Sequence, residues 1–512
     1  MFDGLASTLG ERTELNKVGF TIADRWSYHQ WLKTNPTFEA AGHFLVKEWE
    51  ITANPNDPPN FERLAQFEKQ LSWQDGRGPG VFGAIVADRR LLMGPDCTYT
   101  QDYRRRFTDA QHLCILERAC EAMEQAFDSV KPDLVVGFIC NSILEYLGFL
   151  FARARGIRYL NLRTSRIENR ILLSDSHRDP APEVVATYAA GEGISNTAIA
   201  QAKQLILNAR EVSAKYEGVV SPSSKPARKV PTPRNPLSAA LRFSRSLSEY
   251  RSSGAADDNH CPGLIRPLWF STVRNPILAR KTKKMLGPQY VSAKDLAERR
   301  FAVFPLHTEP EISLTLYGRP YLNQVEVIRA IALSLPADMV LVIKEHPWMV
   351  GKRSLGMYKK FLNIPRVRLA APELNLRDLI TKSSLVTLLT GSSSLEASIL
   401  EKPVVALGPN MVTLLPDSMA VRCRDLTELP EAISKLLNEH EHDETSLERL
   451  YAAIVENTTE VNLYSGLLGR TNSYSTEDRS RDADLNNLAT FLLERAQQPM
   501  ANVPKGYDVG SW

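Results

Sequence analysis

The sequence contains no closely spaced pair of cysteines. None of its six cysteines forms a Cys-x-x-Cys unit, which excludes the commonest structural zinc sites; they lie at positions 97, 114, 120, 140, 261 and 423. Cys114 and Cys120 fall in an apolar pattern of helical period, where buried thiols are common. We therefore expect a protein of a reducing compartment that holds no metal.

A long apolar run is also missing. The most apolar stretch, residues 143–152, is interrupted by Glu145 and is much shorter than the ~20 residues that a membrane-spanning helix needs. The chain opens Met1-Phe2-Asp3-Gly4 and stays polar past Lys17, without the basic start and apolar segment of a secretory signal. These features predict a cytoplasmic protein, either free or held peripherally at the inner face of the cell membrane.

Charge of one sign is not in excess. The 512 residues include 62 Lys and Arg against 59 Asp and Glu, which excludes a dedicated nucleic-acid binder with a strongly basic domain. Apolar residues make up 43% of the chain and charged residues 24%, so disordered, collagenous and coiled-coil classes are excluded. No internal repeat of 20–50 residues is present. At about 150 residues per domain, the length predicts about three domains.

The first part of the chain has the pattern of βα units. Short apolar runs alternate with helical periods, which indicates a parallel sheet. We expect strands at 43–51, 81–87, 134–139 and 158–162, and helices at 109–130 and 143–155, the second of them closed by Gly156. Residues 1–195 are therefore predicted to form a Rossmann-like acceptor domain.

A second α/β series starts at Phe301. We expect strands at 301–305, 339–344, 367–369, 385–389 and 404–407, and helices at 325–335, 376–382 and 395–400. This is the alternation of a doubly wound sheet. Residues 301–436 are therefore predicted to form a Rossmann-like nucleotide-sugar-binding domain, and residues 437–512 a tail with helices at about 445–456 and 484–497.

Residues 196–300 form the predicted connector, in which the composition changes. Residues 221–285 contain thirteen Lys or Arg, three Asp or Glu and eight prolines. We expect part of this stretch to be a flexible linker and part an exposed basic arm. The net charge of +10 over 225–284, together with Trp269 and Phe270, predicts contact with an anionic membrane surface. A linker that pairs with acidic faces of the domains is the alternative.

The strongest site motif is the serine loop, residues 390–394. It follows an apolar strand and opens a helix, where free backbone N–H groups and the helix dipole make an anion site and hydroxyls add donors; its residues are Thr390, Gly391, Ser392, Ser393 and Ser394. In the alternative interpretation, Ser394 only caps the helix. One cap needs one serine, whereas three follow Gly391, so we favour a phosphate site.

Two further segments lie at predicted strand ends. Lys344, His346 and Pro347 follow the apolar strand residues 339–343, at an edge where open α/β sheets bind ligands. Pro347 favours an extended His346, whose imidazole is then free to donate to a phosphate. The segment 305–311, PLHTEPE, contains a histidine and the candidate catalytic residues Glu309 and Glu311. The alternatives are a structural histidine and a charged loop that caps a following turn. Three strand ends are thus predicted to converge at one edge.

In this order, the segments resemble the capsular polysaccharide biosynthesis glycosyltransferases, the family that includes bacterial β-Kdo transferases. The resemblance is carried by PLHTEPE, LPADMVLVIKEHP, RDLITKSSLVTLLTGSSSLEA and KPVVALG between residues 301 and 410, and more loosely by VADRR at 86–90 and KPDLV at 131–135. It implies a GT-B fold, in which two Rossmann-like domains face each other across a cleft and the C-terminal one holds the nucleotide sugar.

The resemblance also implies a CMP- or other nucleotide-activated sugar, no cofactor and no essential metal. The HP motif of the family matches His346 and Pro347, and its serine loop matches residues 391–394. Without a metal, dipoles, hydroxyls and cationic groups must neutralise the leaving phosphate. We assign this role to Ser392, Ser393 and His346, with Lys344 and Arg353 as weaker candidates for further positive charge. Glu396 is placed to reach a ribose hydroxyl, or else has a plain surface role.

The acceptor and the base are expected on the N-terminal domain. Asp88 follows the predicted strand 81–87 and is the candidate base, with Arg89 expected to lower its pKa. An Asp–Arg pair that caps a surface turn is the alternative. The candidates for binding an acidic acceptor are Asn141, Arg163, Arg166 and Glu168.

These features predict a glycosyltransferase that moves a sugar, Kdo or a related acidic sugar from a CMP donor, onto a surface-polysaccharide or lipid-linked acceptor. One alternative is a non-hydrolysing UDP-sugar 2-epimerase, which needs no acceptor. Another is a non-catalytic subunit that binds a nucleotide or a glycan.

Overall fold

The computed structural model divides the chain into two compact units. It describes residues 1–15, 17–71, 80–93, 106–212, 273–309, 313–350, 352–469 and 479–507, with Ser244, Leu247, Ser248, Tyr250, Arg251, Trp269 and Glu311. Residues 1–8, 160–221 and 278–511 form the C-terminal unit, and residues 9–159 with 222–277 form the N-terminal unit. These units do not follow the four segments predicted from the sequence, because the predicted acceptor domain is shared between both.

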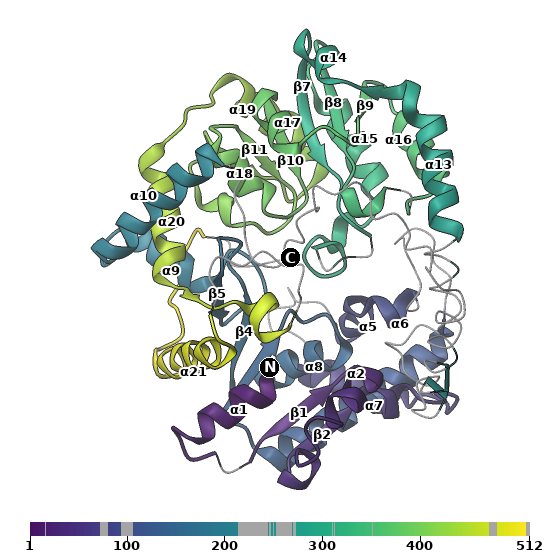
Figure 1. The fold of residues 1–512 in the computed structure, drawn as a ribbon, viewed down its shortest axis with the longest axis vertical. Helices are drawn as coiled ribbons and strands as arrows, with labels where there is room; N and C mark the ends of the chain where they lie inside the picture. The colour runs from purple at the N-terminus through teal and green to yellow at the C-terminus, as the bar shows by residue number, and fades with distance from the viewer. Residues whose placement is uncertain are drawn as a thin grey trace. The chain divides into compact units, whose positions relative to one another are not determined.

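The C-terminal unit is built on a seven-stranded sheet (Figure 1). Its strands are β6 (Tyr290–Val291), β7 (Arg300–Pro305), β8 (Met339–Lys344), β9 (Val367–Ala370), β10 (Leu385–Leu388), β11 (Val404–Ala406) and β12 (Ala420–Arg422). They lie in the order β12-β11-β10-β7-β8-β9-β6, and every pair is parallel. Apart from β6, this is the 3-2-1-4-5-6 order of the dinucleotide-binding fold, and it reverses between β7 and β10. The α/β class with parallel sheets is confirmed.

Helices cover both faces of this sheet, which is why its strands read as continuous apolar runs. The helices are α15 (Gln324–Ser334), α16 (Leu355–Leu362), α17 (Leu376–Lys382), α18 (Ser393–Ile399) and α19 (Leu429–Asn438). Phe301 and Val303 of β7 pack in one core with α17 and α18. Ala302 and Phe304 point to the other face and pack with α15, α16 and α19. The predicted second series is therefore confirmed element by element.

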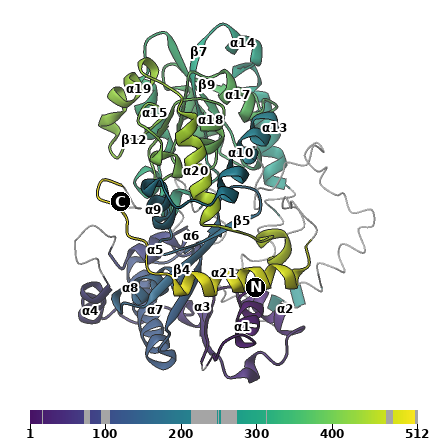
Figure 2. The ribbon, with the colours of Figure 1, turned by 90° about the vertical axis from the view of Figure 1, so that its left-hand side faces the viewer.

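The tail of the chain belongs to the same unit. Helix α20 (Glu444–Glu456) packs along α10 (Asn196–Glu211), as both ribbon views show (Figures 1 and 2). Strand β5 (Arg170–Ser174) pairs antiparallel with β4 (Arg158–Thr164) on one side and with β13 (Thr459–Glu460) on the other. Residues far apart in the sequence are thus joined around the hairpin β4–β5.

Ion pairs and close packing join helices from distant parts of the chain beside this hairpin. Arg495 of α21 (Arg481–Gln497) forms ion pairs with Glu183 of α9 (Pro182–Ala190) at 2.7 Å and with Asp175 at 3.4 Å. Near the start of α1 (Phe2–Gly10), Gly4 lies so close to Leu485 that an added Cβ would meet the leucine Cδ1 at 3.0 Å. The first and the last helix of the chain therefore pack within one unit.

The N-terminal unit contains a parallel pair, β1 (Gly19–Ile22) and β2 (Phe44–Lys47), and strand β3 (Leu134–Phe138). Its helices are α2 (Arg25–Leu32), α3 (Glu48–Thr52), α4 (Phe61–Leu71), α5 (Gly83–Ala87), α6 (Arg89–Met93), α7 (Asp109–Val130) and α8 (Ile143–Ala154). Thr108 and Gln111 form a capping box at the start of α7, and Gly156, with φ of +66°, follows the end of α8. The predicted helices 109–130 and 143–155 are confirmed.

Two predicted strands are wrong in part or whole. The segment 43–51 is a strand only over β2, because α3 begins at Glu48, whose carboxylate and that of Glu50 suit a helix start. The segment 81–87 is helix α5 rather than a strand. A short apolar run bounded by small residues does not distinguish a buried helix from a buried strand, and Ala84, Ile85 and Ala87 are all buried.

Candidate functional site

Two strand ends meet where the strand order of the C-terminal sheet reverses. His307 follows β7, and Thr390 and Gly391 follow β10. The backbone N–H of Thr390 donates a long hydrogen bond of 3.5 Å to Nε2 of His307. A Cβ on Gly391, which has φ of +119°, would lie 3.6 Å from Cε1 of the same ring. The predicted convergence of these two strand ends is therefore present in the structure.

His307 is a neutral hydrogen-bonding group near pH 7. Burial, followed by the charges of Arg166, His346 and Arg353, lowers its pKa to about 4. Because Nε2 accepts from Thr390, the proton of the neutral ring sits on Nδ1, which lies 3.9 Å from Oε2 of Glu311. The Thr308 hydroxyl donates to that same oxygen at 2.5 Å. The structure thus brings the predicted Glu311 next to the imidazole.

The serine loop is organised differently from a simple cap. Ser392, not Ser394, is the residue before helix α18, and its side chain forms no capping hydrogen bond. Ser394 is buried inside the first turn, where its hydroxyl contacts the Gly391 carbonyl and Oδ1 of Asn410, both at 2.8 Å. The alternative in which Ser394 caps the helix is wrong. The half-buried side chains of Ser392 and Ser393 remain at the loop surface.

Lys344, the last residue of β8, and His346, in the loop after it, lie in different surroundings. Lys344 Nζ donates to the carbonyls of Ala371 and Pro372, at 3.0 and 2.8 Å, and burial lowers its pKa to about 8. His346 is exposed and precedes the short helical turn Pro347–Met349, while desolvation, opposed by Glu345, lowers its pKa. The contacts of Lys344 are those of a residue that stabilises the β8–β9 edge, so a role toward a donor stays a prediction.

Glu309 and Glu396 are held in ion pairs. Glu309 is buried, accepts a hydrogen bond from the side chain of Gln324 and lies 3.1 Å from Arg353. Glu396 pairs with Arg377 at 3.2 Å, and both side chains are largely buried. The catalytic role of Glu309 and the ribose-binding role of Glu396 stay predictions, and each would require its carboxylate to leave a partner.

The predicted acceptor residues fall in both units. Arg163 donates to the carbonyls of Ser176 and Arg178 and to Asp179, at 2.7–3.0 Å, which fixes the segment after β5. Arg166, with φ of +67°, lies 3.5 Å from Asp179, and its charge contributes to the lowered pKa of His307. Arg166 is thus a neighbour of the switch-point residues in the C-terminal unit, with Glu168 in the same turn, whereas Asn141 belongs to the N-terminal unit.

Asp88 is a buried helix-end residue. Its carboxylate accepts from the backbone N–H groups of Arg90, Leu91 and Ile143 at 2.9, 3.4 and 3.3 Å. The expectation that a neighbouring arginine lowers its pKa is wrong, because complete burial raises the pKa and the opposing charge, that of Arg90 and not of Arg89, is the weaker effect.

Glu145 is a candidate that sequence reasoning missed. It lies in the first turn of α8, is half-buried, and accepts from the N–H of Asn141 at 3.1 Å. Burial, with a contribution from the Asp88 charge, raises its pKa to about 7. The sequence does contain a sign of this residue's place, because the Ser-x-x-Glu pattern at 142–145 indicates a helix start directly after β3. Only the structure shows that Asp88 and Glu145 influence each other.

Helix α13 (Asn275–Leu286) carries the described part of the basic connector. Thr282 and Leu286 are buried, whereas four basic side chains are exposed and form no ion pair with a described carboxylate: Arg280, Lys281, Lys283 and Lys284. Trp269 is 56% exposed. Phe270 and most of residues 225–274 lie outside the described residues.

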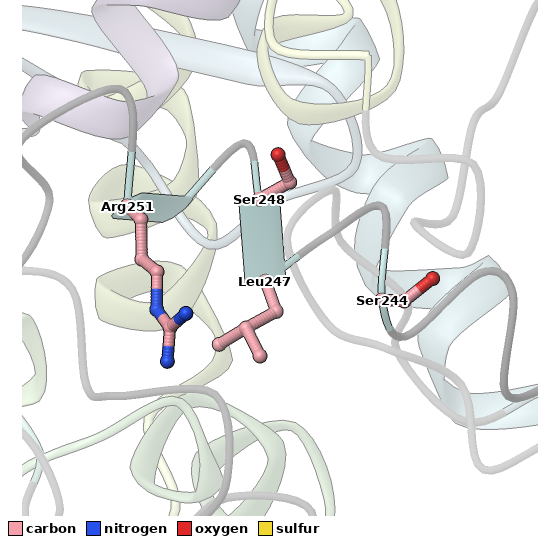
Figure 3. A pocket seen from close by; sticks show the side chains of 4 residues that line it. All are labelled: Ser244, Leu247, Ser248 and Arg251. Atoms are coloured by element: carbon pink, nitrogen blue, oxygen red, sulfur yellow. The ribbon is translucent and has the colours of Figure 1, made fainter.

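A pocket in the connector contains none of the predicted site residues. Ser244, Leu247, Ser248 and Arg251 line it, and the hydroxyls of Ser244 and Ser248 point away from the Arg251 guanidinium (Figure 3). Across the described ranges, no group of three or more His, Cys, Asp or Glu is arranged to hold a metal ion. None of the helices in those ranges combines the length and apolar character that a bilayer span requires.

Comparison with known families gives a match in the central part of the chain. Residues 238–413 match the family model described as "Capsule polysaccharide biosynthesis protein". This match confirms the resemblance that the motifs between residues 301 and 410 carry. No curated protein matches the chain.

Solved structures resemble the chain only distantly. KpsC of Thermosulfurimonas dismutans, as a β-Kdo 2,4 transferase, is 14% identical over 62% of this chain and 78% of its own, with a TM-score of 0.34. The β-Kdo 2,7 transferase structure of KpsC from the same organism is 12% identical over 72% and 89%, with a TM-score of 0.35. UDP-GlcNAc 2-epimerase of Neisseria meningitidis is 10% identical over 94% and 99%, with a TM-score of 0.28. At these scores the likeness carries no argument about activity.

Proposed function

We propose that this protein is a metal-independent glycosyltransferase of GT-B type that moves a sugar from a nucleotide donor onto a surface-polysaccharide or lipid-linked acceptor. The observation that carries the proposal is the meeting of His307 with Thr390 and Gly391 where the strand order reverses, because doubly wound sheets bind nucleotides at that crevice. The family match over residues 238–413 supports the sugar-transfer chemistry. A CMP-activated Kdo or related acidic sugar is the donor we favour.

The donor phosphate lies against the serine loop. Backbone N–H groups after Gly391 and the hydroxyls of Ser392 and Ser393 supply hydrogen-bond donors, and His346 adds a further one. Arg166 supplies a fixed positive charge beside His307. Such groups stabilise the negative charge that develops on the leaving phosphate without a metal.

The acceptor hydroxyl loses its proton to a carboxylate of the N-terminal unit. Glu145 suits this task better than Asp88, because its half-buried carboxyl titrates near pH 7, where a general base works best. The oxygens of Asp88 already accept three backbone N–H groups. Asp88 instead raises the pKa of Glu145 through its charge.

The proposal extends to the membrane. The exposed basic side chains of α13 and the exposed Trp269 suit an anionic lipid surface, where a lipid-linked acceptor lies. This contact makes the protein peripheral to the inner face of the cell membrane.

A panel of CMP-, UDP- and GDP-sugars tests the donor assignment by thermal shift. A ligand at 100 times its dissociation constant stabilises the folded state by ~2.7 kcal/mol, so a bound nucleotide class raises the melting temperature. Transfer to an added glycan or lipid-linked acceptor supports the proposal. Interconversion of the nucleotide sugar alone identifies an epimerase, and binding without turnover on any acceptor identifies a non-catalytic subunit.

A further inference from the structure

The side chain of Arg353 is completely buried beneath the loops that follow β7 and β8. Its Nε donates to Oε2 of Glu345 at 2.7 Å, and a second guanidinium nitrogen lies 3.1 Å from Oε1 of Glu309. The exposed fractions of the three side chains are 0% for Arg353, 5% for Glu345 and 0% for Glu309. The hydroxyl of Tyr358, on α16, donates to Glu345 at 2.8 Å. We call these four residues the Arg353 cluster.

The cluster reaches the backbone of both histidines. Arg353 donates to the carbonyl of His307 at 2.9 Å, and Glu345 accepts from the N–H of His346 at 2.8 Å. Gln324 completes the connection, because its side chain accepts from the N–H of His307 at 2.9 Å and donates to Glu309. Both backbone hydrogen-bonding groups of His307, its N–H and its carbonyl, are thus held by buried side chains.

The charge state of the cluster keeps these contacts in place. Burial alone would lower the pKa of Arg353, but the charges of Glu345 and Glu309 outweigh it and raise the pKa. Burial and Glu345 likewise raise the pKa of Tyr358, so its hydroxyl stays a donor. Removing one member leaves a buried charge or lone pair unpaired, which is costly. Both loops are therefore bound to the same buried charged group.

We propose that Arg353 is a positioning residue that holds the loops after β7 and β8 in one register, so that His307 and His346 meet the donor together. Neither the resemblance nor the family match assigns it a role. The sequence predicts Arg353 as a weaker candidate for positive charge toward the donor phosphate, whereas its side chain is completely buried. The proposal rests on the proposed function only for the role of the two histidines toward the donor.

The conservative variant Arg353→Lys tests the coupling, since a lysine keeps the charge but cannot make the forked contacts. Hydrogen exchange of the native protein is the first readout, because it needs no substrate. We expect faster exchange in peptides covering 305–309 and in those covering 344–348, in the same variant. Arg495→Lys is the matched control: Arg495 is also a buried arginine between two carboxylates of this unit, but it contacts neither loop.

Turnover and nucleotide binding form the second readout. Residues that orient a functional group through another residue typically change activity about 10- to 100-fold, and we expect a loss of this size in kcat/KM for Arg353→Lys but not for Arg495→Lys. Binding of CMP and UDP, measured by calorimetry, should weaken in parallel. In the His346→Ala background, Arg353→Lys should lower kcat/KM by a much smaller factor than in the native background, because the effects of coupled residues are not additive.

A milder variant keeps the proposal testable if Arg353→Lys does not fold. Tyr358→Phe removes one hydrogen bond to Glu345 and no charge, and should lower kcat/KM by up to about tenfold with the same two-loop exchange pattern. Exchange that rises in only one loop, or equally in Arg495→Lys, would overturn the positioning role. If CMP and UDP fail to bind the native protein while the two-loop pattern appears, the proposed function fails and the coupling stands.

Discussion

The backbone N–H of Thr390 donates to the imidazole of His307 across a separation of 83 residues in the sequence. This hydrogen bond joins the ends of β7 and β10, the two strands between which the sheet order reverses. It also fixes the tautomer of the ring, so that the Nδ1 proton faces Glu311. The candidate donor site is therefore organised by backbone contacts before any ligand binds.

His346→Ala should weaken donor binding without unfolding the protein. The side chain is exposed, so its removal leaves no cavity. A hydrogen bond to a charged group contributes about 1.5–3 kcal/mol, which corresponds to roughly a 10- to 150-fold loss in affinity. Calorimetry with CMP and UDP measures the loss, and an unchanged circular dichroism spectrum is the control. Equal affinity in the variant and the native protein removes His346 from the site.

Replacing Ser392 and Ser393 together by alanine should weaken binding of the free nucleotide and of inorganic phosphate. Both serines lie at the loop surface, so stability should change little. Ser394→Ala is the matched control, because its buried hydroxyl contacts Asn410 and its loss should lower the melting temperature. If the double variant binds nucleotide as the native protein does, the two serines have no role in anion binding.

Glu145→Gln should change stability in a pH-dependent way. The folded-state pKa is raised from 4.5 to about 7, so the protonated carboxyl contributes stability below pH 4.5 that is lost as the pH rises to 7. Glutamine does not ionise, so the free energy of unfolding of the variant should rise relative to that of the native protein over this pH range, by roughly 3 kcal/mol at most. Urea unfolding at pH 4.5, 6 and 8 measures the difference, and the exposed Glu121→Gln, on a neighbouring helix of the same unit, is the control.

The same Glu145 variant should lose acceptor-dependent transfer. General-base catalysis contributes about 10²- to 10⁴-fold, and a loss within this range is expected while CMP and UDP bind as before. The corresponding Asp88→Asn variant is expected to lower the pKa of Glu145, because it removes the Asp88 charge that helps to raise it. A pH–rate profile that keeps its acidic limb in Glu145→Gln would contradict the assignment.

Neutralising the basic face of α13 should release the protein from anionic vesicles. Each Lys or Arg near such a surface contributes about 1 kcal/mol, so replacing Arg280, Lys281, Lys283 and Lys284 by glutamine should lower co-sedimentation by two to three orders of magnitude at low salt. Binding should also fall with added salt, since the Debye length is about 10 Å at 0.1 M. The control variant replaces four other exposed lysines of the same unit, Lys294, Lys359, Lys360 and Lys382. Equal binding of the two variants identifies the connector as a linker.

The sequence predicts the C-terminal sheet well because its strands are buried on both faces. Runs such as 339–343 are apolar throughout and alternate with longer amphipathic helix patterns, which favours strands buried on both faces. The proximity of His307 to the serine loop can also be predicted from the sequence, because the carboxyl ends of parallel strands lie at one edge of a sheet. The serines were correctly located, although which of them faces inward depends on Asn410, a contact that no local pattern encodes.

Long-range contacts explain what the sequence does not predict. The segment 81–87 satisfies a strand pattern and a helix pattern alike, and only packing on α8 decides between them. The sequence predicts a phosphate-directed charge for Arg353, and only the structure shows that Glu309 and Glu345 lie on either side of it. Burial raises the pKa of Glu145, and the charge of Asp88 adds to the effect. Asp88 contacts the backbone of Ile143, which lies 55 residues further along the chain.

The contact between Gly4 and Leu485 sets an order of events during synthesis. The ribosome adds about 5–20 residues per second, so α21 is made roughly half a minute to one and a half minutes after α1. During that interval the apolar face around Leu5, which is 3% exposed in the finished protein, has no native cover from α21. The C-terminal unit is thus completed only after α21 has been made, and until then α1 is a natural client for a ribosome-associated chaperone.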